Sequence, residues 1–200
     1  MGKRLKELIG RRSLLQAVTA TGLLLGLGGI ASWTSRRSAA DPYLVRPPGG
    51  QDEARFTSLC IKCNRCTEIC PEDVIVNAGV RDGPLVARTP RLDFSLGYCD
   101  FCMDCIVVCP TAALLPIRKS EAKLGIAVIM KDRCIPWQWG GCTRCYEKCP
   151  EKAIILDEFK RPIVVADKCN GCGLCKLVCP TDQLRSYKPG QTRGIEIERT

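Results

Sequence analysis

Cysteine is the feature that most limits what this chain can fold into. The chain has 200 residues, of which 16 are cysteines, and histidine is absent. At this density, cysteines form either a disulfide framework or a set of metal ligands. Without histidine there can be no Rieske centre, no Cys₂His₂ zinc site, no histidine-ligated haem and no Ser-His or Cys-His catalytic pair.

All of the cysteines belong to four copies of one pattern, which we call motifs one to four. Three copies have the spacing Cys-x₂-Cys-x₂-Cys-x₃-Cys-Pro, whereas motif three has seven residues in its first gap. This is the bacterial ferredoxin run, in which three cysteines hold one [4Fe–4S] cube and the fourth crosses to a neighbouring cube. The cysteines of the four motifs are, in order, Cys60, Cys63, Cys66 and Cys70; Cys99, Cys102, Cys105 and Cys109; Cys134, Cys142, Cys145 and Cys149; Cys169, Cys172, Cys175 and Cys179.

The repeated spacing favours iron–sulfur clusters over the other uses of cysteine. Structural zinc needs two separated pairs of ligands and has no use for the x₃-Cys-Pro step, while disulfides would not need one spacing four times. We therefore expect four [4Fe–4S] clusters held by these sixteen residues. Two pairings are open: adjacent, joining motif one with two and three with four, or nested, joining one with four and two with three.

The segments between the motifs predict short strands and short helices. β-type runs occur at 74–76, at 125–129 and at 153–157, and the last is followed by a polar turn and a second run at 162–167, which predicts a hairpin. The expected fold is α+β, with tandem bacterial-ferredoxin-like modules. The expected divisions are a signal or anchor (1–40), a linker (41–55), two ferredoxin-like halves (56–118 and 119–188) and a tail (189–200).

The N-terminus has the order of an export signal: basic residues, an apolar stretch at 17–33, then small residues. Arg11 and Arg12, followed by Ser13-Leu14-Leu15, resemble a twin-arginine signal. Cleavage of the signal after Ala40 fits the small residues that precede the cleavage site of export signals. The alternative is that the segment stays uncleaved as a membrane anchor. The twin-arginine translocase exports folded proteins, so thiolates already bound to iron would be protected from an oxidising compartment.

The net charge of +9 gives no support for nucleic-acid binding. Residues 1–40 alone contribute +6 and the remainder +3. Four cubes with their thiolates would add about −8, which makes the loaded protein mildly acidic. The carboxylates of the motifs, such as Glu68, Asp73, Asp104 and Glu147, are expected to be solvated or ion-paired rather than catalytic.

The widened gap of motif three contains Trp137 and Trp139. Three interpretations are open: a tolerated surface loop, a cover that keeps water from a cluster, or a docking surface for a redox partner.

The chain resembles the MauM/NapG group of periplasmic ferredoxin-type proteins over nearly its whole length. The resemblance includes the twin-arginine leader, the seven-residue gap of motif three, the run Leu44-Val45-Arg46-Pro47-Pro48-Gly49 and the block Cys169-Asn170-Gly171-Cys172-Gly173-Leu174-Cys175. Motif two departs from the nitrate-reductase members, which usually carry a longer gap before its third cysteine. The resemblance implies transfer of electrons from a membrane quinol-oxidising partner, often itself a polyferredoxin, to a periplasmic oxidoreductase such as nitrate reductase, or a role in methylamine utilisation.

The leading hypothesis is therefore an electron carrier without its own substrate, located in the periplasm. A second hypothesis is the electron-transfer subunit of a molybdenum oxidoreductase complex of the DMSO-reductase kind. A third is a disulfide-rich secreted binding module, which predicts a colourless protein.

Overall fold

The computed structural model describes residues 44–181 and 193–199, a part of the chain that contains every cysteine. The expected export signal lies outside the described residues. Within them, no helix is both long enough and apolar enough to cross a bilayer.

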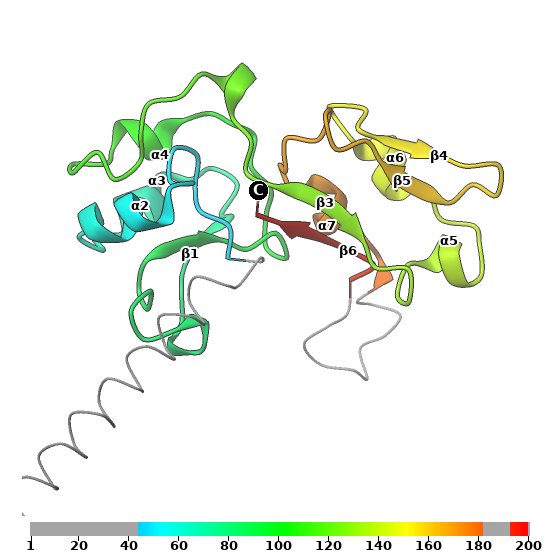
Figure 1. Ribbon diagram of the computed structural model, residues 1–200, viewed down its shortest axis with the longest axis horizontal. Helices are drawn as coiled ribbons and strands as arrows, with labels where there is room; N and C mark the ends of the chain where they lie inside the picture. The colour runs from blue at the N-terminus through cyan, green and yellow to red at the C-terminus, as the bar shows by residue number, and fades with distance from the viewer. Residues whose placement is uncertain (1–43, 182–192, 200) are drawn as a thin grey trace, which may run out of the picture.

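The first half of the molecule is built from short elements around motifs one and two (Figure 1). Helix α2 begins where the Asp52 side chain accepts a hydrogen bond from the N–H of Arg55. The elements in chain order are α2 (Glu53–Leu59), α3 (Arg65–Ile69), β1 (Ile75–Asn77), the 3₁₀ turn η1 (Val80–Asp82), β2 (Pro90–Leu92) and α4 (Asp104–Val107).

The second half repeats this plan around motifs three and four. Its elements are the 3₁₀ turn η2 (Lys119–Glu121), β3 (Ile126–Ile129), α5 (Ile135–Gln138), α6 (Arg144–Lys148), β4 (Ile154–Leu156), β5 (Pro162–Val164), α7 (Leu174–Leu177) and β6 (Ile195–Glu198). The tandem modules of short strands and short helices are therefore as the sequence predicted. In Figure 1 the two halves lie side by side, and β3 and β6 of the second half lie near the middle of the molecule.

Three two-stranded antiparallel sheets are present in the described residues: β1 with β2, β4 with β5, and β3 with β6. The β4–β5 pair is the predicted hairpin, with Ile154 opposite Val164. The β3–β6 pair differs from expectation, because residues 195–198 were expected in a tail. The alternation Ile195-Glu196-Ile197-Glu198 explains it: both isoleucines are 2% exposed and face the core.

Residues 44–50 also differ from the expected linker, because all seven are buried. The carbonyl of Val45 accepts a hydrogen bond from the N–H of Leu92, and that of Gly49 accepts one from Leu115. Gly49 has φ +81, and a side chain there would lie 2.2 Å from the Leu115 oxygen. This segment is part of the first half rather than a connection to it.

The apolar core is small and contiguous with the cysteines. Phe56, Phe94, Leu114 and Leu124 are buried in one cluster, and most cysteines pack within it or against it. Small modules of this kind have little core of their own, so bound metal would be coupled to folding.

Candidate iron–sulfur sites

The cysteines converge in sets of four, each with three from one motif and one from another. Set A consists of Cys60, Cys63 and Cys66 with Cys109, which surround a mostly apolar cavity of about 30 Å³. Its fourth member comes from motif two, so motif one does not close its own site.

Two further sets surround cavities of the same kind in the second half. Set D consists of Cys134, Cys142 and Cys145 with Cys179, around about 20 Å³. Set C consists of Cys169, Cys172 and Cys175 with Cys149, around about 10 Å³. Motifs three and four thus exchange their fourth cysteines.

Set B consists of Cys99, Cys102 and Cys105 with Cys70, and its members influence one another electrostatically. Burial raises the pKa of the Cys99 thiol to about 12, and Cys70 and Cys102 add to that shift. The pKa of Cys105 is likewise raised to about 12, first by burial and then by Cys99, by Cys66 of the neighbouring set A, and by Cys102 and Cys70. Helices α3 and α4, which precede the fourth cysteines of motifs one and two, pack together.

This convergence decides between the two pairings left open by the sequence. Motif one exchanges its fourth cysteine with motif two, and motif three exchanges with motif four. The pairing is therefore adjacent and not nested. Since α3, α4, α6 and α7 are each only four or five residues long, each helix carries its fourth cysteine a short distance to the neighbouring set.

The loops of motifs one, two and four share one backbone conformation. In motif two, Phe101 (φ 59) and Met103 (φ 69), on either side of Cys102, are left-handed. Motif one repeats this at Lys62 and Asn64, and motif four at Gly171 and Gly173. Two left-handed residues around the second cysteine bend the loop around the site.

Backbone N–H groups point at the sulfurs, as the ferredoxin pattern predicts. The N–H of Ala153 donates to Cys149 Sγ at 3.3 Å, and that of Ala127 donates to Cys169 Sγ at 3.4 Å. Burial alone would raise the pKa of Cys109, but hydrogen bonds from the N–H groups of Leu114 and Thr111 outweigh it and lower that pKa. Such donors stabilise negative charge on sulfur.

The more buried thiols need a compensating cation if they are to ionise. Burial raises the pKa of Cys66 and Cys134 to about 11 and that of Cys145 to about 12. None of the sixteen cysteines, which all lie within the described residues, forms a disulfide. Four thiolates around one cavity would repel one another, and bound iron would supply the compensating charge.

The donor sets fit a [4Fe–4S] cube: four cysteines, N–H donors and apolar walls. Between residues 44 and 181, and at 193–199, no cysteines or carboxylates are grouped closely enough to hold a single metal ion. The two observations agree, because in a cube each thiolate binds a different iron and the sulfurs stand farther apart than around one zinc.

The long loop of motif three forms helix α5. Ile135 and Pro136 line the cavity of set D, while Trp137 packs farther out. Lys131 Nζ lies over the Trp137 ring, 4.3 Å from the ring centroid. The indole N–H of Trp137 donates to the Pro162 carbonyl at 3.4 Å. Trp139 is 73% exposed. The aliphatic residues of the insertion, rather than its tryptophans, therefore wall the site.

Sets B and C meet where the two halves of the chain join. The backbone N–H of Cys99 donates to the carbonyl of Cys172 at 2.8 Å, and the N–H of Leu124 donates to the carbonyl of Asn170 at 2.9 Å. A side chain at Gly173 would lie 1.9 Å from the Phe94 ring, so only glycine allows this contact. The four sets consequently follow one another in the order A, B, C, D.

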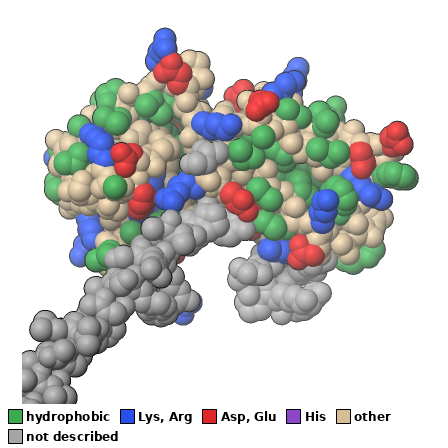
Figure 2. All heavy atoms as spheres, viewed as in Figure 1, with side chains coloured by type: hydrophobic (Ala, Val, Ile, Leu, Met, Phe, Trp, Pro, Cys, Tyr) green, Lys and Arg blue, Asp and Glu red, His purple; other side chains and the backbone are tan. Residues whose placement is uncertain are grey.

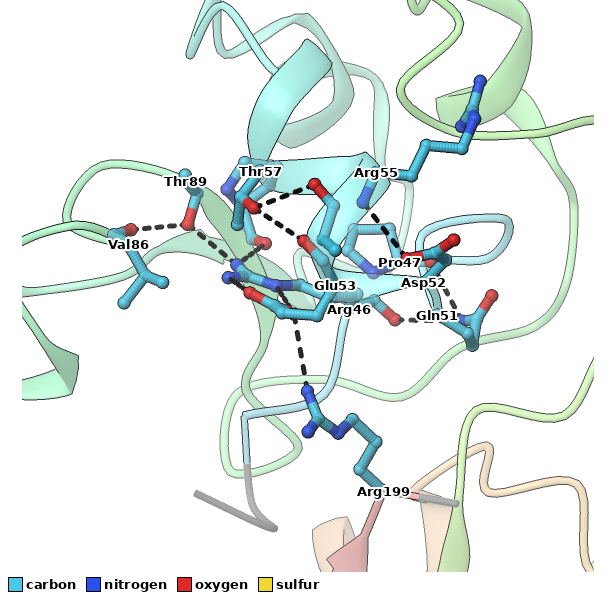
Figure 3. A network of polar contacts seen from close by, with 12 residues as sticks. Arg46, Pro47, Gln51, Asp52, Glu53, Arg55, Thr57, Val86, Thr89 and Arg199 are labelled. Atoms are coloured by element: carbon cyan, nitrogen blue, oxygen red, sulfur yellow. Dashed lines mark hydrogen bonds and ion pairs between the residues drawn. The ribbon is translucent and has the colours of Figure 1, made fainter. Parts of the chain in front are cut away.

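A buried arginine braces set A, and no motif in the sequence pointed to this role. Arg46, 1% exposed, donates to both carboxylate oxygens of Glu53 and, at 2.8 Å each, to Thr89 Oγ1 and the Pro90 carbonyl (Figure 3). Its guanidinium lies 4.8 Å from the centroid of the Phe56 ring. Phe56 and Pro90 both line the cavity of set A, so Arg46 fixes two of its walls.

The same network reaches the C-terminal strand. In Figure 3, Arg199 approaches Glu53 from the end of β6, with Nη1 3.5 Å from Oε2. Through Glu53, the N-terminal segment and the C-terminal segment are tied to one carboxylate.

Family comparisons agree with the division into two paired halves. Two segments, residues 59–114 and 127–185, each match a model described as a 4Fe-4S dicluster domain. The first contains motifs one and two, and the second motifs three and four, as adjacent pairing requires.

Relatives of the whole chain are ferredoxin-type proteins. The chain is 33% identical over 201 residues to the ferredoxin-type protein NapG of Escherichia coli (strain K12), covering 92% of this chain and 87% of that one. It is 34% identical over 176 residues to the methylamine utilization ferredoxin-type protein MauM of Methylophilus methylotrophus, covering 81% and 77%. The ferredoxin-type protein NapF of Escherichia coli (strain K12) is 28% identical over 144 residues, 70% of this chain and 82% of that one. The chain belongs to the NapG/MauM family of ferredoxin-type proteins and is an iron–sulfur electron-transfer protein.

Proposed function

We propose that this chain holds four [4Fe–4S] clusters, one on each of sets A to D, and relays electrons between a membrane quinol-oxidising partner and a periplasmic reductase. All sixteen cysteines of the four motifs act as ligands, and the chain has no substrate site of its own. The observation that carries the proposal is the continuous order of the sets, joined at the hydrogen bond between Cys99 and Cys172. A relay needs such an order, because electrons pass only between neighbouring centres.

The location follows from the N-terminus. Residues 1–40 carry the paired arginines, and they direct export of the folded, loaded chain by the twin-arginine translocase. The resemblance to the MauM/NapG group favours a nitrate reductase as acceptor, and the name of the methylamine utilization relative favours an oxidoreductase of methylamine metabolism.

The relay is tested with purified protein prepared without oxygen. The loaded chain is reduced with dithionite, freed of excess reductant and mixed with a periplasmic nitrate reductase. Addition of nitrate should restore the visible absorbance of the oxidised clusters. The absorbance should not return when the nitrate reductase or the nitrate is left out. A reduced chain that passes no electrons to this enzyme or to a methylamine-pathway oxidoreductase contradicts the relay. Isolation of the chain in a stable complex with a molybdenum-containing subunit supports the second hypothesis instead.

A further inference from the structure

The loops around the four sets carry different charges. Between its first and last cysteine, motif two contains two acidic residues and no basic residue, a formal charge of −2. Motifs one, three and four each carry +1 over the corresponding segment. On the face shown in Figure 2, acidic and basic side chains are interspersed over both halves, so this difference is local to the loops.

The acidic residues of motif two lie against set B. Asp100 is half-buried, and its Oδ1 accepts a 3.0 Å hydrogen bond from the N–H of Cys102. Burial is the largest reason that the pKa of Cys102 is raised, and the carboxylates of Asp100 and Asp104 add to it. A basic group does reach this loop: Lys119 Nζ donates at 2.9 Å to the backbone carbonyl of Asp100, and Lys119 itself is exposed to solvent.

Set C provides a matched site with a neutral residue. Asn170 occupies the position of Asp100, and its Oδ1 accepts a 3.1 Å hydrogen bond from the N–H of Cys172. The flanking residues have the same left-handed conformation in both loops. Leu174 takes the position of Asp104. Set C has acidic neighbours of its own: the exposed Glu151 acts on Cys172 and accepts a 3.0 Å hydrogen bond from Asn170 Nδ2, and Glu121 and Asp167 lie around Cys169 and Asn170.

We infer that the cluster on set B has the lowest reduction potential of the four, and that Asp100 and Asp104 are the residues that lower it. The inference rests on the proposed function, which places a cube on each set. Adding one electron makes a cluster more negative, and fixed negative charge beside it disfavours that step. Asp100 contributes more than Asp104, because Asp104 is exposed and its field is screened by solvent and salt.

The position of set B gives this difference a consequence for electron transfer. Set B lies between set A and set C, on the near side of the Cys99–Cys172 contact. A transferred electron therefore resides mainly on sets A, C and D and crosses set B as an uphill step. That step limits passage between the halves and prevents set B from storing electrons.

The test compares Asp100→Asn with Asn170→Asp in the loaded full-length chain. Asparagine keeps the hydrogen bond from Cys102 and removes only the charge, so Asp100→Asn should raise the lowest midpoint potential in an EPR-monitored redox titration. The three other midpoints should move much less. Asn170→Asp should lower a different midpoint, that of set C.

Iron content and the lowest midpoint potential together keep this inference separate from the proposed function. Iron content shows whether each variant still holds all its clusters, and about 16 irons per chain are expected in both variants. Full iron content with an unmoved lowest midpoint in Asp100→Asn overturns the inference and leaves the four clusters intact. Low iron content in the wild-type chain overturns the proposed function itself. If Asp100→Asn fails to load, Asp104→Asn should shift the same midpoint in the same direction by a smaller amount.

Discussion

The backbone N–H of Cys99 donates a 2.8 Å hydrogen bond to the carbonyl oxygen of Cys172, which joins a member of set B directly to a member of set C. No outer cysteine, from set A or set D, takes part in this contact. The two halves therefore meet at their inner sites, and sets A and D lie at the two ends of the series.

The junction should depend on Gly173. Its φ of +82 and its contact with Phe94 leave no room for a side chain, so Gly173→Ala should destabilise the protein by about 1–3 kcal/mol and slow electron exchange between the halves. Thermal unfolding and pulse-reduction kinetics measure the two effects. Gly140→Ala is the matched control, because Gly140 has φ +84 and a Cβ added there would meet no atom within 4 Å. Equal effects of the two substitutions would mean that backbone strain, not packing against Phe94, decides the outcome.

The exchange of fourth cysteines is tested by Cys179→Ser. Cys179 lies with Cys134, Cys142 and Cys145, so its loss should damage the cluster of set D and remove up to about four irons. Cys109→Ser should instead damage set A. EPR spectra of both variants identify the missing centre. Loss of the motif-one cluster in Cys179→Ser would support nested pairing and contradict the structure.

The Arg46 network should be required for set A. Arg46→Met leaves the Glu53 carboxylate without its main partner and removes the contact of the guanidinium with Phe56. We expect the free energy of unfolding to fall by about 3 kcal/mol. The set A cluster should be lost before the others. Iron analysis measures the cluster content, and chemical denaturation measures the free energy of unfolding. Arg118→Met serves as control, because its ion pair with Glu121 is largely exposed. If Arg46→Met keeps the set A cluster in full, the cavity of set A does not need the arginine for its structure.

A hydroxyl should tune set D. Thr181 is 2% exposed, and its Oγ1 lies 3.1 Å from Cys179 Sγ, to which it donates when the sulfur is a thiolate. Thr181→Val should lower the midpoint potential of set D, and Thr181→Ser should restore it. The corresponding contact in set A, Thr111 with Cys109, is longer at 3.9 Å, so Thr111→Val should shift its midpoint less. An unchanged midpoint in Thr181→Val would exclude the hydroxyl as a donor to the cluster.

The motif spacing alone predicted that the first three cysteines of each motif lie together, because the x₂, x₂ and x₃ gaps fix the loop and the short helix that follows. It could not predict which motif Cys109 or Cys179 joins, since that depends on how α3 packs on α4 and how α6 packs on α7. The two glycines of Cys169-Asn170-Gly171-Cys172-Gly173 were visible in sequence, but their neighbours Gly125 and Phe94 are distant in the chain.

The chain ends were the least predictable parts. Residues 44–50 fall within the expected linker, yet Arg46 in this segment donates hydrogen bonds to Glu53, Thr89 and Pro90. The strand Ile195–Glu198 has the alternation of a half-buried strand, but only the position of β3 gives it a partner.

The proposed relay depends on four cubes per chain, and the most direct measurement is the iron and acid-labile sulfide content of the full-length protein purified without oxygen. Four cubes predict about 16 irons and about 16 sulfides per chain. Stoichiometric zinc, or far less iron in protein made with an ample supply of clusters, would contradict it.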